Sequence, residues 1–292
     1  MGKKMNRMTS FDAVIIVILS IVILVTLYPM YYVAISSVSN PTRLISHQGP
    51  LFYPLGIDFS SYKLVFDNPM ISRGYINTIL YVIVGTTVNV TMTILGAFVL
   101  SRKGLYWGKL LRLMVVFTLF FSSGLIPFYL VVDKVGLMGN WLAVIVPYAI
   151  NPMNLIIMRT SFMTIPQSLE EAARLDGAKE IYVLFRIIVP LSMPIIAVMI
   201  LFYGVGHWSS WFSAMIFIKK REMFPLQLIL REILITNSTE SMMTSVGGSD
   251  KAPLTETIKY ATIIVATVPI LLVYPFLQKY FIKGVMVGAI KE

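Results

Sequence analysis

One polar stretch interrupts the apolar second half of the chain: Ile165-Pro166-Gln167-Ser168-Leu169-Glu170-Glu171-Ala172-Ala173-Arg174-Leu175-Asp176-Gly177-Ala178-Lys179-Glu180. Ser168 followed three residues later by Glu171 is a capping box, which predicts a helix from about residue 169. Gly177 is the residue type that commonly ends a helix, and a second helical stretch over 178–188 follows it. We therefore expect two short amphipathic helices bent at a glycine. Because apolar sequence flanks both sides, this polar elbow must lie outside the lipid and is expected to meet a partner.

The composition is that of a membrane protein. The chain has 292 residues, of which 57% are hydrophobic and 13% charged, whereas soluble domains carry about 25% charged residues. We infer an all-α polytopic membrane protein. The net charge of +10 is explained by basic loops that orient such a protein, so no nucleic-acid partner is expected.

Six apolar regions are long enough to cross a bilayer as helices, which requires about 18 residues or more. The first follows a basic start and is too long for a signal-peptide core, so we expect an uncleaved anchor. The regions are approximately 13–38, 74–100, 113–131, 135–158, 187–218 and 260–277.

The orientation follows from the basic residues of the short loops. The loop 102–112 contains Arg102, Lys103, Lys109 and Arg112, whereas the loop 132–136 contains only Lys134. We therefore expect both termini and the polar elbow in the cytoplasm. The predicted parts are a cytoplasmic N-terminus 1–12, a first span 13–38, an extracytoplasmic loop 39–73, a core 74–282 and a cytoplasmic tail 283–292.

Two of the predicted outer segments are long. The segment 39–73 contains four prolines and is expected to form an ordered, turn-rich cap. The segment 219–257 contains a short amphipathic helix over 224–234, followed by a Ser/Thr/Gly-rich stretch, 236–253, that we expect to be mobile.

No enzyme chemistry is expected of this chain. It has no cysteine, which excludes disulfides and thiolate metal sites, and its two histidines, His47 and His207, lack metal-ligand spacing. It has no phosphate-binding Gly-x-x-x-x-Gly-Lys-Ser/Thr loop. The six spans carry no Asp or Glu away from their ends, which disfavours a proton-coupled carrier. We therefore expect a conduit without a metal or cofactor of its own.

Neutral polar and aromatic residues within the spans are the candidates for a substrate pathway. Gly204 and Gly206 favour a bend in the fifth span, and His207, Ser210 and Trp211 are spaced to share a helix face. Aromatic rings beside hydroxyl and imidazole groups suit a sugar, but packing between helices explains the same residues. The candidates are Asn89, Ser122, Asn151, Asn154, His207, Trp208, Ser210 and Trp211.

The polar elbow also resembles a known loop. Glu171-Ala172-Ala173, three residues, Gly177, nine residues and then Ile187-Ile188-Val189-Pro190 is similar to the EAA loop of bacterial ABC importer permeases, with Val189 where that family usually has Leu. In that family the loop is a coupling helix that docks in a cleft of the cytoplasmic ATPase. The resemblance implies a coupling role for Ser168, Glu170, Glu171, Ala172, Ala173, Asp176, Gly177 and Ala178.

Further motifs resemble the carbohydrate-uptake branch of these permeases, and in particular subunits of oligo- and polysaccharide importers such as those for alginate. They are Ser101-Arg102-Lys103-Gly104, Gly124-Leu125-Ile126-Pro127, Leu155-Ile156-Ile157-Met158-Arg159, Gly206-His207-Trp208 and 225–232.

This resemblance implies the type I importer permease fold with six transmembrane helices in the bacterial inner membrane. It also implies a second homologous permease, two ATPase subunits that carry ATP and Mg, an extracytoplasmic binding protein and an oligosaccharide, for which alginate and other uronate oligomers are the acidic candidates. By the same analogy, Lys219, Lys220, Arg221 and Arg231 are candidate contacts of the binding protein.

Three alternatives stay open at this stage. The basic residues 219–221 could simply stop a span at the membrane edge, or could attract an anionic partner by electrostatic steering. The permease could carry a solute other than a carbohydrate. The chain could instead be a membrane channel or scaffold that needs no ATP.

Overall fold

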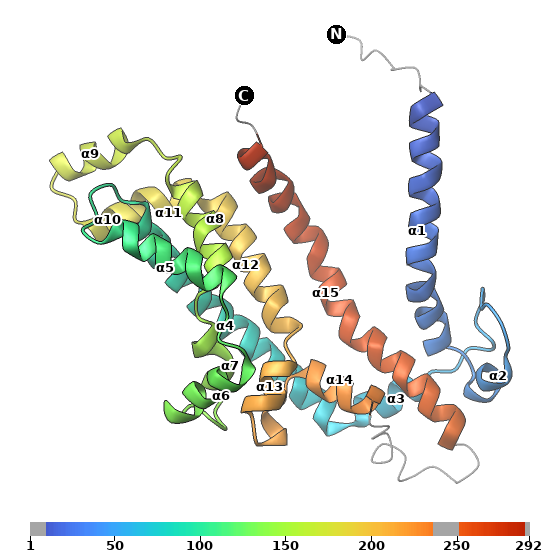
Figure 1. Ribbon diagram of the computed structural model, residues 1–292. Coiled ribbons are helices and arrows are strands. Elements are labelled where there is room, and N and C mark those ends of the chain that lie inside the picture. Colours follow the sequence, from blue (N-terminus) through green and yellow to red (C-terminus); the bar gives the residue numbers. More distant parts are fainter. Residues whose placement is uncertain (1–9, 236–250, 290–292) are drawn as a thin grey trace. The chain divides into compact units, whose positions relative to one another are not determined.

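The computed structural model describes residues 10–235 and 251–289, with side chains in its last helix over 254–272 (Figure 1). The secondary structure of these residues is helical, apart from one isolated bridge between Ser39 and Ile57. The helices are α1 (Ser10–Ser37), α2 (Pro41–Ser46), α3 (Ser60–Asp67), α4 (Pro69–Ser101), α5 (Gly108–Phe120), α6 (Leu125–Lys134), α7 (Leu142–Ile145), the 3-10 turn η1 (Val146–Tyr148), α8 (Pro152–Phe162), α9 (Gln167–Leu175), α10 (Glu180–Val183), the π turn η2 (Leu184–Ile188), α11 (Val189–Leu191), α12 (Met193–Trp208), α13 (Phe212–Phe217), the 3-10 turn η3 (Arg221–Met223), α14 (Leu226–Ile235) and α15 (Lys251–Ala289).

The chain divides into two compact units. One contains the described residues as far as Asn68 together with the described part of Glu232–Thr267, and the other contains Pro69–Arg231 and α15 from Val268. In the first unit the segment after α1 is ordered by turns, by α2 and α3, and by a hydrogen bond of 2.7 Å from Ser61 Oγ to Thr257 Oγ1. This segment therefore has the turn-rich structure that its prolines predict. The small core of this unit consists of Ile35, Leu44 and Leu51.

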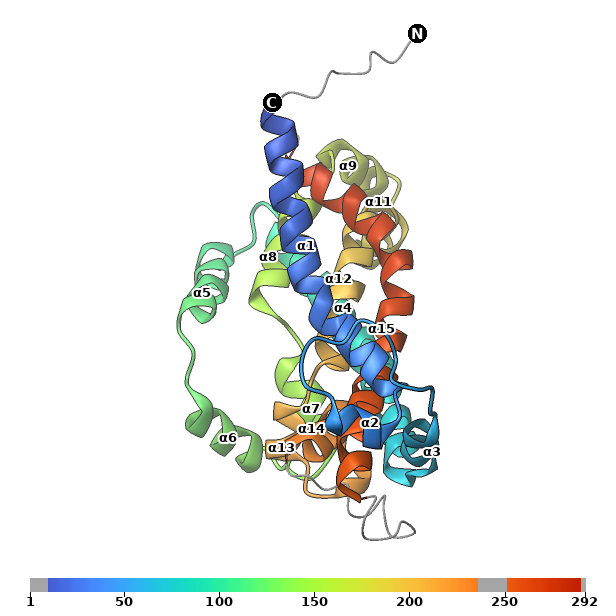
Figure 2. The ribbon, with the colours of Figure 1, turned by 90° about the vertical axis from the view of Figure 1, so that its right-hand side faces the viewer.

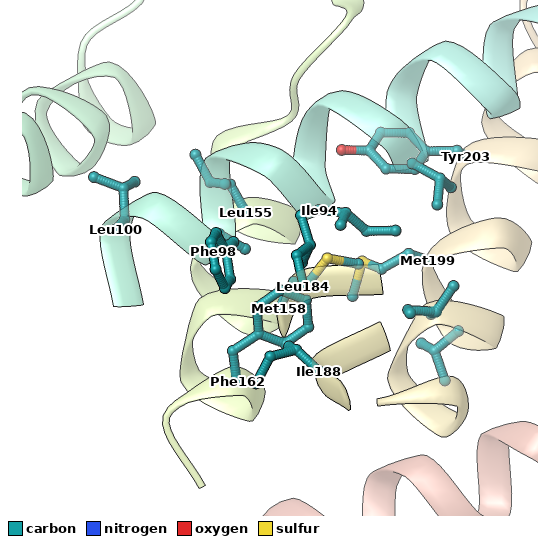
Figure 3. Close-up of a cluster of buried hydrophobic side chains, with 14 of the residues drawn as sticks. Ile94, Phe98, Leu100, Leu155, Met158, Phe162, Leu184, Ile188, Met199 and Tyr203 are labelled. Atoms are coloured by element: carbon teal, nitrogen blue, oxygen red, sulfur yellow. The ribbon is translucent and has the colours of Figure 1, made fainter. Parts of the chain in front are cut away.

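The second unit is built around α4, a helix of 33 residues. The C-terminal half of α4 packs against α8, η2 and α12, whose apolar side chains point toward one another (Figure 3). Small residues allow this close packing, because a Cβ added at Gly96 would lie 3.0 Å from Leu155 Cδ1. The cluster is what fixes the end of α4 to the segment that precedes α12.

The N-terminal half of α4 holds α14 in the same way. Thr78 Oγ1 accepts a hydrogen bond of 2.8 Å from the backbone N–H of Leu226, and Tyr81 OH donates one of 2.7 Å to the carbonyl of Met223. Asn77 Nδ2 donates to the carbonyls of Glu222 and Phe224 at 2.8 and 3.0 Å. The amphipathic helix predicted over 224–234 is therefore confirmed as α14, and α4 satisfies the backbone groups of the turn that leads into it.

Several predicted spans are interrupted. By length and composition α1, α4 and Leu254–Leu272 of α15 can each cross a membrane, and two bent pairs raise the number among the described residues to as many as five. The pairs are Leu142–Tyr148 with Pro152–Phe162, bent by 49°, and Glu180–Leu191 with Met193–Trp208, bent by 85°. The prediction of one continuous helix over 187–218 is therefore wrong. Two prolines four residues apart, Pro190 and Pro194, remove backbone donors on either side of the bend.

The predicted third span, 113–131, is also not one helix. It is divided into α5 and α6, which a non-helical link over 121–124 connects (Figure 2). Gly124 has a φ of 77°, a conformation that ends regular helix and that glycine adopts without strain. The serines and glycine of this region thus interrupt the helix.

The boundaries near the end of the chain differ from those predicted. The helix α15 begins at Lys251 and continues to Ala289, so it includes the last residues of the predicted outer loop 219–257 and most of the predicted tail 283–292. Residues 236–250, most of the stretch expected to be mobile, lie outside the described residues, as do 1–9 and 290–292.

The close approach of α14 to α4 makes a prediction about Gly74. A Cβ at this position would lie 2.5 Å from Ile229 Cδ1 and 3.1 Å from Leu226 Cα, so Gly74→Ala should destabilise the fold by about 1–3 kcal/mol through overpacking. Gly206→Ala is the matched control, because nothing lies within 4 Å of its added Cβ. Heat denaturation followed by size-exclusion chromatography compares the two variants, and equal midpoints would contradict the close approach.

Candidate functional site: a coupling helix and a polar cavity

The polar elbow forms the helix α9, but not by the predicted capping box. The helix begins at Gln167, its N-cap residue is Pro166, and no side chain caps it. Ser168 therefore lies inside the first turn rather than before it. The preset φ of Pro166, −57°, suits a helix start, which explains why the helix begins two residues early.

The predicted end of α9 at Gly177 is confirmed. The N–H of Ala178 donates to the carbonyl of Ala173 at 2.9 Å, and the N–H of Gly177 donates to the carbonyl of Arg174 at 3.0 Å. Gly177 has a φ of 82°. These two bonds and the left-handed glycine define a Schellman motif, which fixes the angle at which the chain leaves α9.

The second half of the elbow is anchored in the core. The stretch predicted as helix over 178–188 is helical only from Glu180, and it contains the π turn η2. Val183, Leu184 and Ile188 from this stretch are buried in the cluster around α4. The helix α9 thus lies beyond the ends of α8 and α10 (Figure 1). The segment that follows it, α10 with η2, is packed into the core of the unit.

The predicted coupling residues divide by exposure. Ser168, Glu171, Ala172, Asp176 and Gly177 are exposed, and Ala173 and Ala178 are half-buried. Glu170 is only 7% exposed, because it forms an ion pair with Arg102. The sequence interpretation missed Leu175, whose 90% exposure leaves an apolar side chain in solvent one turn after Glu171.

A polar cavity of about 550 Å³ lies among α4, α8, α12 and α13. This volume is within the range of small-molecule sites. Trp208 instead lines a neighbouring, more apolar cavity of about 1100 Å³, which shares Asn151 and Asn154. Ser122 lies in the exposed link between α5 and α6, where its hydroxyl accepts a bond of 3.3 Å from the N–H of Gly124. Six of the eight predicted pathway residues line the smaller cavity: Asn89, Asn151, Asn154, His207, Ser210 and Trp211.

One wall of this cavity is a buried hydrogen-bond chain. Asn89 Nδ2 donates to the carbonyl of Tyr148 at 2.6 Å, which turns its Oδ1 toward His207 Nε2 at 2.6 Å. An amide oxygen can only accept, so His207 carries a hydrogen on Nε2 and donates it. Gly85 makes room for the imidazole, since an added Cβ would lie 2.4 Å from His207 Nε2.

Tyr203 joins a second part of the wall. Its hydroxyl lies 2.7 Å from Thr93 Oγ1 and accepts a bond of 3.2 Å from the N–H of Asn151. The side chain of Asn151 in turn caps α8 by accepting from the N–H of Asn154 at 3.1 Å. Tyr203 was not predicted as a site residue, although its place one helical turn before His207 was a signal for it.

The expected bend at the two glycines is wrong. Gly204 and Gly206 lie within regular α12, and a Cβ added at Gly204 would lie 3.8 Å from Thr86 Oγ1. The helix ends at Trp208, and Trp211 and its neighbours turn into the cavity through the following break. His207, Ser210 and Trp211 were predicted to share one face of a helix. They do lie together at the cavity, but because the chain turns after Trp208 rather than because one helix carries all three.

The predicted basic residues lie in two environments. Lys219, Lys220 and Arg221 are exposed in the turn beside α4. Arg231 belongs to α14, is half-buried and stacks on Trp211, with its guanidinium carbon 4.7 Å from the ring centroid. This contact places a positive charge against a ring that lines the cavity.

The fold and these features define a multi-pass membrane transport component. The model of the family "Binding-protein-dependent transport system inner membrane component" matches residues 9–287, and the chain belongs to this family. The resemblance to ABC importer permeases is thus confirmed, and the chain is a permease rather than an enzyme.

Two relatives and one solved structure are similar to this chain over nearly their whole length. The polygalacturonan/rhamnogalacturonan transport system permease protein YtcP of Bacillus subtilis (strain 168) is 37% identical over 98% of this chain and 99% of its own. Protein LplC of the same organism is 38% identical, with 96% and 95% covered. A solved structure of a bacterial ABC transporter involved in the import of the acidic polysaccharide alginate has 31% identity and a TM-score of 0.85, with 96% of this chain and 99% of that chain covered.

The buried chain through Asn89 makes a prediction about stability. Asn89→Leu leaves the His207 Nε2–H and the Tyr148 carbonyl without partners, and each should cost about 1–3 kcal/mol. The control is Thr91→Val on the exposed side of the same helix. Loss of helix during titration with a denaturing detergent, followed by circular dichroism, should occur earlier for Asn89→Leu alone. Coincident transitions would exclude the hydrogen-bond chain as a structural element.

Proposed function

We propose that this chain is one of two permease subunits of an ATP-driven importer and that the importer carries acidic oligosaccharides of the uronate type. The observation that carries the proposal is the polar cavity with Trp211 and His207 in its wall. A sugar stacks its apolar face on an indole ring while its hydroxyl groups meet imidazole, amide and hydroxyl partners.

The preference for an acidic sugar rests on charge. No Asp or Glu is among the residues that line the smaller cavity in the described part of the chain, so a carboxylate meets no like charge there. Arg231 on Trp211 adds a positive charge behind the wall. Two relatives point the same way, because polygalacturonan and alginate are both polymers of sugar acids.

The partners follow from the class of transporter. The importer would contain a second homologous permease, two ATPase subunits that bind ATP and Mg, and an extracytoplasmic sugar-binding protein. The chain would lie in the bacterial inner membrane with both termini and α9 in the cytoplasm. Lys219, Lys220 and Arg221 are the candidate contacts for the binding protein, whereas Arg231 is better placed for the cavity wall than for that contact.

The docking face for an ATPase subunit would be the exposed side of α9. Glu171 and Leu175 are four residues apart and therefore neighbours on the helix surface, with Ser168 and Ala172 beside them. Burial of the exposed Leu175 side chain in a complementary cleft of the ATPase would stabilise the complex, and the neighbouring charge of Glu171 would favour one orientation of it. ATP-driven closure of the two ATPase subunits would then move α9 as a rigid lever.

The substrate proposal is tested with the complete importer in proteoliposomes. Trigalacturonate, loaded on the binding protein, should stimulate ATP hydrolysis and be taken up, whereas maltotriose should do neither. Trp211→Ala should reduce uptake roughly tenfold, because stacking on an aromatic ring is lost, and Trp107→Ala, at an exposed position away from the cavity, should not. Stimulation by maltotriose alone would overturn the acidic substrate class.

The docking face makes a separate prediction. Leu175→Ser should lower the amount of ATPase that co-purifies with the tagged chain, since the variant loses about 2 kcal/mol of apolar burial at the interface. Met163→Ser is the control, because Met163 is also exposed and apolar but lies outside α9. Equal recovery of the ATPase with both variants would exclude Leu175 from the interface.

A further inference from the structure

The residue that directly follows α4, Arg102, makes an unusual set of contacts. Its guanidinium lies over the ring of Phe98, 3.8 Å from the centroid, and forms an ion pair with Glu170 of α9. The side chains of Arg102 and Glu170 are only 19% and 9% exposed. Burial lowers the pKa of Arg102, the nearby charge of Glu180 raises it, and an arginine remains charged under either influence.

Other contacts tie the same two segments together. Lys103 Nζ donates to Gln167 Oε1 at 3.2 Å, which joins the loop to the first turn of α9. Arg174 pairs with Glu180 at 2.9 Å and lies 3.9 Å from Glu170. The first turn of α9, its last turn and the start of α10 thus meet at one charged cluster beside the end of α4.

The end of α4 is itself firmly held. Arg159 Nε of α8 donates to the carbonyl of Leu100 at 2.9 Å. Phe98 and Leu100 are buried in the apolar cluster with Met158 and Phe162 of α8 (Figure 3). The ion pair therefore joins α9 to a part of the unit that buried apolar contacts and a hydrogen bond both hold in place.

We propose that Arg102 and Glu170 form a latch that makes α9 move together with α4, so that Arg102 is a positioning residue for coupling. The proposal rests on the proposed role of α9 as the coupling helix. Glu170 then holds α9 to Arg102 within this chain and does not contact the ATPase. Its neighbour Glu171 is exposed and is therefore the glutamate that can contact the ATPase.

Through this latch, a movement of α9 would be transmitted along α4 to the cavity. Arg102 directly follows α4, and α4 itself contains Asn89 and Thr93, which form part of the cavity wall through their hydrogen bonds. A helix moves as a stiff body over this distance, since its backbone bonds are all internal. Without the latch, α9 would still bind its partner but would transmit less of its motion.

The test uses the complete importer and measures sugar uptake, ATP hydrolysis and subunit stoichiometry together. Arg102→Met and Glu170→Met should each retain the ATPase subunits but lower uptake per ATP about fivefold or more, the lower range of coupling between sites. The double variant should be less impaired than either single variant, because a buried pair replaced by apolar side chains leaves no orphan charge. Lys109→Met is the control, because it removes an exposed cation in the first turn of α5, outside the cluster around Glu170, and it should leave uptake per ATP unchanged.

Two results would overturn the latch. One is unchanged uptake per ATP in both single variants, and the other is a double variant whose loss is the product of the two single losses. An unaltered importer without sugar-stimulated hydrolysis would instead contradict the proposed function, so the two failures are distinguishable.

A second measurement covers variants that assemble poorly. The chain contains no cysteine, so Lys103→Cys and Gln167→Cys introduce a single reactive pair at a contact of 3.2 Å. A short bis-maleimide should join them rapidly in the otherwise unaltered chain and several-fold more slowly after Glu170→Met. Equal rates would show that the ion pair does not position α9, and would overturn the proposal.

Discussion

The requirement that polar groups in a membrane find partners within the protein governs the second unit. In hydrocarbon there is no water to satisfy an amide or a hydroxyl, so a buried polar residue of α4 is stabilised where it meets a specific group. Thr78 meets the start of α14, Asn89 meets His207 and the carbonyl of Tyr148, and Thr93 meets Tyr203. These pairings fix which segment lies beside which turn of α4, a choice that apolar packing alone leaves open.

The same constraint explains where the helices break. A break exposes backbone groups, which is tolerated inside a membrane protein only where protein or a polar cavity receives them. The break before α8 is capped by Asn151 and opens onto the cavity, and the break after Trp208 places Trp211 there as well. The interruptions therefore add Asn151 and Trp211 to a cavity whose other wall, Asn89 and His207, comes from the helices α4 and α12.

The sequence predicted this site better than its surroundings. The end of α9 followed from Gly177, and α14 followed from a clear amphipathic pattern, because both signals are local. Most of the cavity residues were found because an amide or imidazole in an apolar run requires a protein partner. The breaks at Ser192 and after Phe120 were not found, since apolar composition is the same for a straight and for a broken span. Tyr203 was missed because its hydroxyl partners are remote in sequence.

The sequence motif of α9 contains two adjacent glutamates, Glu170 and Glu171, but does not determine which of them faces the rest of the chain and which faces a partner. Successive residues of an α-helix are separated by about 100° around its axis, so Glu170 and Glu171 cannot face the same surroundings. Neither carboxylate can be buried without a cation, because removal of a lone charge from water is costly. Arg102 supplies that cation on one side only, and Glu171 is left exposed. The division between an internal and an external role thus depends on a residue far from the motif, at the end of a different helix.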